Sequence, residues 1–165
     1  MEIKKKESAS FVGIWQAIFR NKKTGKIERV KEYQNLLPTI GRRAVVMQFA
    51  GTNTEELEVK YIAVGTGSTA PSNADTKLEF EVTRKAVGSG TVNGVEASIA
   101  AFFSTADIPD KTYLELGAFA DGGITASSAA ADSGILVSHV AVVETVSATQ
   151  TMTLTFRISA NDGGA

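Results

Sequence analysis

The chain has 165 residues, of which 43% are hydrophobic and 21% charged, a balance typical of a folded domain. Its net charge of −1 lacks the basic excess that accompanies phosphate-backbone binding, so we expect no direct nucleic-acid binding. Because the sequence contains no cysteine, disulfides, thiolate metal sites and a cysteine nucleophile are excluded. No apolar run reaches the ~18 residues of a membrane-spanning helix, and no membrane contact is expected.

The first predicted structure is a β-hairpin. Residues 1–10, which include Lys4-Lys5-Lys6, are expected to form a flexible tail. Segment 11–20 is rich in β-branched and aromatic residues, and its aromatic residues recur on one side at the period of a strand. A polar turn follows, and segment 27–33 returns with many charges. The second strand is therefore predicted to have a solvated face or an edge position.

A single helix is predicted over residues 39–50. Thr39 can accept hydrogen bonds from the unpaired amides of the first turn, and Gly51 provides a stop signal. The apolar residues at helical spacing predict that the helix lies on the body of the protein. They are Ile40, Ala44, Val45, Met47 and Phe49.

The remainder of the chain has a β pattern with glycine-rich turns such as Gly88-Ser89-Gly90 and Asn93-Gly94. This rhythm predicts a mainly β fold, an antiparallel, jelly-roll-like β-sandwich with one short helix packed on it. The domain should span residues 11–159, with a flexible tail at 160–165. The further strands are expected at residues 57–64, 80–87, 95–103, 113–119, 135–143 and 152–158. The expected core includes Trp15, Phe49, Phe102, Phe119 and Phe156.

Patterns that could support catalysis are weak. Gly65-Thr66-Gly67 follows a strand, but the lysine and the third glycine of phosphate-binding loops do not follow, so a plain turn is favoured. His139 is the only histidine, and its neighbour Ser138 would point to the opposite face of a strand. We therefore interpret His139 as a surface or hydrogen-bonded strand residue.

Metal and carboxylate sites are also weakly indicated. Asp121-Gly122-Gly123 and residues 161–164 offer oxygen ligands in turns, but without the spaced ligands of a calcium loop. The acidic pairs Glu55-Glu56 and Glu79 with Glu81 are more typical of exposed segments than of glycosidase acids. The sequence therefore predicts no enzyme, no catalytic residue, no metal and no cofactor.

Several short motifs occur together in order along the chain. They are Asn35-Leu36-Leu37, Gly41-Arg42, the strand Tyr61 to Gly67, Ala70-Pro71, Asp75-Thr76-Lys77-Leu78-Glu79, Thr83-Arg84, Tyr113 to Phe119 and Met152 to Phe156. This set resembles small structural proteins of tailed bacteriophages, of the tail-fibre or capsid-decoration kind. In that group the acid after Asp-Thr-x-Leu lies further along, whereas here it falls early, at Glu79 or Glu81.

The resemblance implies a non-enzymatic virion component that is made in the bacterial cytoplasm and binds other virion proteins and copies of itself, with a trimer as the first expectation. The candidate contacts lie on the charged hairpin strand and on two loops rich in small residues, 65–75 and 124–133. They are Glu28, Arg29, Lys31, Glu32, Thr66, Ser68, Thr69, Ser127 and Ser128.

Two other functions remain open at this point. The first is a carbohydrate-binding β-sandwich module used in attachment to a host surface, with Trp15, Tyr33 or Tyr61 stacking on sugar rings. The second is a hydrolase that depends on Glu115 or His139.

Overall fold

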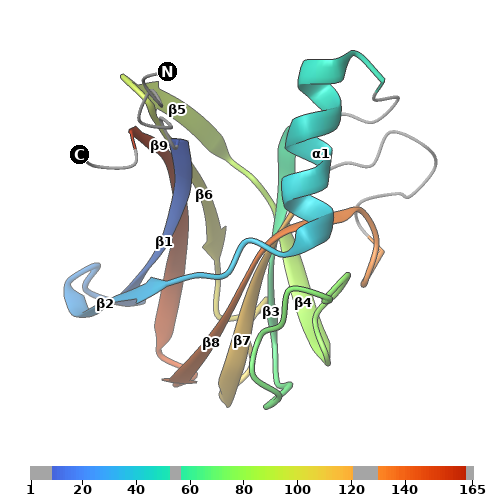
Figure 1. The fold of residues 1–165 in the computed structure, drawn as a ribbon. Helices are drawn as coiled ribbons and strands as arrows, with labels where there is room; N and C mark the ends of the chain where they lie inside the picture. The colour runs from blue at the N-terminus through green and yellow to red at the C-terminus, as the bar shows by residue number, and fades with distance from the viewer. Residues whose placement is uncertain (1–8, 53–56, 121–129, 163–165) are drawn as a thin grey trace, which may run out of the picture.

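Two antiparallel sheets face each other in the computed structural model, which describes residues 9–52, 57–120 and 130–162, and one helix lies beside them (Figure 1). The first sheet has the strand order β2-β1-β9-β6-β5 and the second the order β4-β3-β7-β8. The predicted antiparallel β-sandwich with a single short helix is confirmed. The strands of the first sheet are β1 (Ala9–Asn21), β2 (Ile27–Gln34), β5 (Ser89–Asn93), β6 (Glu96–Phe103) and β9 (Gln150–Asp162). Those of the second are β3 (Val59–Gly65), β4 (Glu81–Ala86), β7 (Lys111–Ala120) and β8 (Ile135–Val146), and the helix is α1 (Thr39–Ala50).

The main core lies between the sheets. Strict alternation along β9 turns Met152, Leu154 and Phe156 inward and leaves the intervening residues half-buried. Trp15 of β1 lies opposite Phe156, and the two ring centroids are 5.3 Å apart. A smaller apolar cluster contains Leu78, Phe119, Ala63 and Leu136. Trp15, Phe119 and Phe156 are buried, as the sequence predicts.

Two aromatic residues expected in the core lie at the surface instead. Phe102 is 54% exposed because it alternates with the buried Ala101 and Phe103 along β6, so its side chain leaves the opposite face of the sheet. Phe49 is 85% exposed because it lies in the last turn of α1, whereas the buried residues of this helix are Gly41 and Ala44.

The helix contacts the second sheet through small residues. A Cβ atom at Gly41 would lie 2.9 Å from both the Leu136 carbonyl oxygen and the Val137 Cα, so the helix backbone approaches β8 more closely than any side chain allows. The predicted helix bounds are confirmed, but the capping role of Thr39 is wrong. Pro38 is the N-cap residue and makes no side-chain cap, while the Thr39 amide donates to the Asn73 carbonyl at 2.9 Å.

The sheets also differ from the expected pattern in their extent. The sequence predicts a turn around Gly88-Ser89-Gly90, but the structure has the edge strand β5 there. After β4 the chain crosses to the first sheet, and β5 pairs with β6 through a tight turn at Gly94. β1 and β9 pair from Ala9 to Asp162, inside the segments 1–10 and 160–165 that were expected to be flexible. Within the described residues, no helix has the length and hydrophobicity needed to span a bilayer.

Candidate functional site

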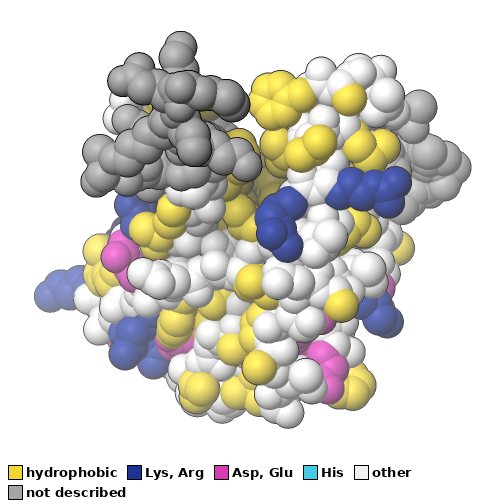
Figure 2. All heavy atoms as spheres, in the orientation of Figure 1, with side chains coloured by type: hydrophobic (Ala, Val, Ile, Leu, Met, Phe, Trp, Pro, Cys, Tyr) yellow, Lys and Arg dark blue, Asp and Glu magenta, His cyan; other side chains and the backbone are white. Residues whose placement is uncertain are grey.

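An apolar groove opens to solvent between α1 and the end of the first sheet. Its volume is about 250 Å³, and it adjoins a second hollow of about 250 Å³ through the shared residues Phe11 and Ile158. Figure 2 shows hydrophobic side chains over the upper part of α1 and in the hollow beside it, with Lys or Arg side chains lower on the same helix. The groove is lined by Phe11, Leu37, Gly41, Arg42, Val45, Val46, Phe49, Val137 and Ile158, and the second hollow adds Val92, Val95, Ala97 and Ala160 among others.

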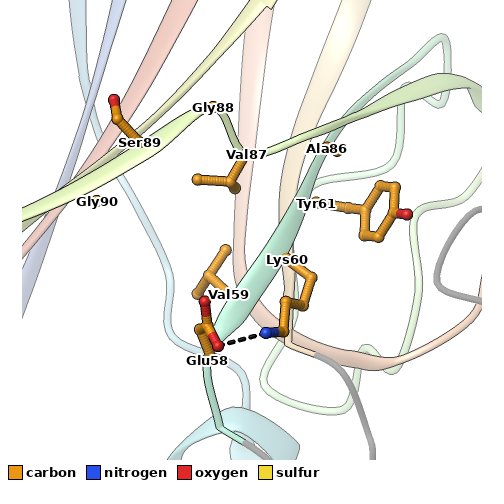
Figure 3. A pocket seen from close by; sticks show the side chains of 9 residues that line it. All are labelled: Glu58, Val59, Lys60, Tyr61, Ala86, Val87, Gly88, Ser89 and Gly90. Carbon is orange, nitrogen blue, oxygen red and sulfur yellow. Dashed lines mark hydrogen bonds and ion pairs between the residues drawn. The ribbon is translucent and has the colours of Figure 1, made fainter.

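A third hollow, of about 370 Å³, lies where the chain passes from β4 to β5 (Figure 3). Val59 and Val87 face each other across it, and the Val87 amide donates to the Lys60 carbonyl at 2.8 Å. Glu58 forms an ion pair with Lys60 at the other end. The glycine-rich rim of this hollow is the beginning of β5.

His139 is buried between two carboxylates. Its Nδ1 lies 2.8 Å from Asp75 Oδ2, and its Nε2 lies 3.1 Å from Glu115 Oε2. Glu115 Oε1 also accepts hydrogen bonds from the amides of Gly67 at 2.9 Å and Phe80 at 2.8 Å. The cluster therefore ties the loop after β3 to strands β7 and β8. Among the residues that the structure describes, no group of His, Cys, Asp and Glu side chains is placed to hold a metal ion.

Hydrogen bonding determines the charges in this cluster. Burial alone would raise the pKa of Glu115, but hydrogen bonds from His139 and from the amides of Phe80, Glu79 and Gly67 lower this pKa to about 2. Burial opposes the charged form of His139, yet hydrogen bonds to Glu115 and Asp75 raise its pKa above the ordinary value. The raised pKa of His139 favours its imidazolium form, which lies between Glu115 and Asp75. Both ring nitrogens are hydrogen-bonded within the chain, so His139 links Asp75 of the loop after β3 to Glu115 of β7.

The cluster predicts a pH window for stability. The Glu115 contribution is complete above its ordinary pKa of 4.5 and declines toward pH 2, whereas the His139 contribution is complete below 6.5 and is lost as pH rises through the folded-state pKa. We expect the melting temperature of the native protein to decline as the pH rises above 6.5 and through the raised pKa of His139, but not in His139→Gln. Calorimetry at a series of pH values measures this, and the sequence offers neither a second histidine nor a cysteine to titrate there. An unchanged decline in the variant would contradict the assignment.

Three of the four charged residues predicted as contacts on β2 have partners within the chain. Arg29 forms an ion pair with Glu144 of the second sheet at 2.7 Å, and its guanidinium lies 3.9 Å from the centroid of the Phe19 ring. Glu32 accepts from Arg157 at 2.8 Å, Glu28 accepts from Asn21 at 2.9 Å, and Lys31 is exposed. Arg29 therefore connects the two sheets and contributes to the stability of the fold.

The loop residues predicted as contacts fall into two groups. The Thr66 amide donates to the Phe80 carbonyl at 2.9 Å, and Thr69 donates to Glu79 from its amide at 2.8 Å and from its hydroxyl at 2.9 Å. Ser68 is exposed between them. The part of the loop that holds Thr66 and Thr69 is therefore structured by its own hydrogen bonds and folds back on Glu115, whereas Asn73 further along accepts from Arg42, which lines the groove. Ser127, Ser128 and the turn Asp121-Gly122-Gly123 lie outside the described residues, as do Glu55-Glu56 and Gly163-Gly164.

Close packing explains why positions 65 and 67 are occupied by glycine. A Cβ atom at Gly65 would lie 2.4 Å from Glu115 Oε1, and one at Gly67 would lie 2.4 Å from the Cβ of Glu79. The turn therefore does bind an anionic group through an amide, but the group is the Glu115 carboxylate of the same chain.

The aromatic residues proposed for sugar stacking are engaged inside the fold. Trp15 is fully buried, and its Nε1 donates to Ser138 Oγ at 2.7 Å. The Tyr33 hydroxyl donates to Glu144, and the Arg84 guanidinium lies 5.8 Å from the centroid of the Tyr61 ring. Trp15 is therefore wrong as a stacking residue, because its long strand turns it toward the core.

Sequence reasoning missed Val46, Phe49 and Val92 as surface residues. No pattern in the sequence separates these exposed apolar residues from buried ones, since only Gly41 and Ala44 of α1 are buried in the structure. Comparisons of the chain with protein-family models, with curated proteins and with solved structures found no match.

Proposed function

We propose that this protein is a non-enzymatic structural component of a tailed-phage virion that acts through contacts between subunits. The apolar groove beside α1 carries the proposal, because it exposes large hydrophobic side chains that a domain acting alone would gain stability by burying. Phe49 is 85% exposed and Val46 is 65% exposed, and both line this groove. The resemblance to small structural proteins of tailed bacteriophages is the reason for proposing a virion as the assembly.

The charges around the groove define the partner segment. Helix α1 has Arg42 and Arg43 on exposed positions and contains no acidic residue. An apolar segment with acidic flanking residues on a neighbouring virion protein complements this surface, since apolar contacts fill the groove and carboxylates face the two arginines.

The test is incorporation into particles. In phage whose copy of the gene carries Phe49→Asp, we expect the protein to be made and folded but reduced in purified particles by at least about tenfold, because a buried carboxylate at the interface is strongly unfavourable. Quantitative mass spectrometry of gradient-purified particles measures the copy number.

Phe102→Asp is the matched control. Phe102 is also an exposed phenylalanine, but it lies on the outer face of the first sheet, away from the groove. This variant should be incorporated normally. Absence of the native protein from purified particles would refute the proposed function, and equal losses in the two variants would refute the role of the groove.

A further inference from the structure

The edge strand β5 differs from the other sheet edges in its chemistry. The sequence of β5, Ser89–Asn93, contains no charged residue, and all five of its residues are exposed. The opposite edge strand, β2, carries Glu28, Arg29, Lys31 and Glu32, which is a common protection against pairing with another chain. β5 therefore lacks the charges that keep edge strands apart.

The two edges of the second sheet are also protected. β4 contains Glu81, Arg84 and Lys85. Along the edge strand β8, His139 exchanges two backbone hydrogen bonds with Leu36, each 3.0 Å long, and Arg29 donates to the Thr145 carbonyl. Within the part of the chain that the structure describes, β5 is the edge strand that carries no charge and that no other segment covers.

The register of the β5–β6 hairpin shows which backbone groups of β5 face outward. Asn93 pairs with Glu96 across the two-residue turn, so this pair exchanges both of its hydrogen bonds. Because bonded pairs alternate along an antiparallel ladder, Thr91 and Ser89 also bond to β6. The amide and carbonyl groups of Gly90 and Val92 consequently point away from the sheet.

These outward groups are complementary to a second copy of the same strand. If two β5 strands lie antiparallel about a twofold axis at Thr91, Gly90 of one copy pairs with Val92 of the other, and both pairs can exchange two hydrogen bonds. Val92 is 78% exposed, and a Cβ atom at Gly90 would meet nothing within 4 Å. The side chain of each Val92 can therefore pack over the bare backbone of the partner's Gly90.

We infer that β5 is a self-association edge, through which two copies of this chain join their five-stranded sheets into one continuous sheet. This inference deepens the proposed function, on which it rests, by naming one subunit contact and its partner, a second copy. The contact is isologous and closes on itself, so it forms pairs and not open fibres.

Sedimentation of the purified full chain over a range of concentrations tests the inference. The native protein should reach a dimer, and Val92→Lys should raise the dimer dissociation constant by at least about tenfold, because the two lysines would lie on one face of neighbouring strands. Val30→Lys is the matched control, since Val30 is 48% exposed on the opposite edge strand β2, and it should leave the dimer intact.

Amide hydrogen exchange gives a second test that needs no variant. In the dimer the amides of Gly90 and Val92 should be protected, and on dilution they should exchange while the Thr91 amide, bonded to β6, stays protected. A native protein that is monomeric at every concentration would overturn the inference. A dimer that withstands Val92→Lys, or one in which the Gly90 and Val92 amides exchange freely, would overturn it as well.

The two proposals fail separately. A protein found in purified particles but monomeric in solution would remove only the β5 contact. A β5 dimer that is absent from particles would remove only the virion assignment.

Discussion

Replacing Glu115 by leucine should lower the free energy of unfolding by about 3 kcal/mol or more. The carboxylate accepts from the amides of Gly67, Glu79 and Phe80 and from His139, and its side chain is only 2% exposed. Leucine offers no acceptor, so the donors of Gly67, Glu79 and Phe80 lose a partner in a site with little access to water. Urea unfolding followed by tryptophan fluorescence measures the change, since the single Trp15 reports on the core.

Glu79→Gln is the control for this substitution. Glu79 belongs to the same loop and also accepts hydrogen bonds, but these come from Thr69 in an exposed site, and they lower the pKa of a carboxylate that remains in contact with solvent. We expect a much smaller loss of stability for this change than for Glu115→Leu, because water can replace the hydrogen bonds of an exposed carboxylate. A loss below about 1 kcal/mol in Glu115→Leu would show that the cluster does not hold the loop.

Most strands could be predicted because local patterns determine them, whereas β5 was not predicted. β9 alternates polar and apolar residues from Thr151 to Asn161, and the bounds of α1 follow from the apolar spacing and the stop at Gly51. The pairing of β9 between β1 and β6 could not be predicted, because alternation determines which face is buried but not which strand lies next to it.

The buried cluster around His139 could not be predicted from local sequence patterns. Asp75, Glu115 and His139 are far apart in the sequence, and each one alone has the appearance of an ordinary polar residue. Only the fold brings them together, because the loop after β3 turns back over β7 and β8. The motifs Gly65-Thr66-Gly67 and Asp75 to Glu79, which contribute to the phage resemblance, meet in this cluster, so their residue types have a structural reason.

The apolar groove could not be predicted for a different reason. Hydrophobic spacing on a helix indicates an apolar face, and such faces are usually buried. Here Gly41 brings only the first half of α1 against β8, and the geometry leaves Phe49 outside the core. An exposed apolar face of this kind has the same sequence pattern as a buried one, so only the structure distinguishes them.

Phe156→Ala should cost about 3–5 kcal/mol of unfolding free energy, because Phe156 is fully buried at the centre of β9 and packs on Trp15. That is a large part of the 5–15 kcal/mol typical of a domain. Phe102→Ala is the matched control: the same atoms are removed from the neighbouring strand β6, where the side chain is 54% exposed, and we expect a loss below about 1 kcal/mol. Chemical denaturation of both variants measures the difference. Equal losses would mean that the two sheets do not enclose the β9 face that carries Phe156, and that the alternation along this strand does not define the core.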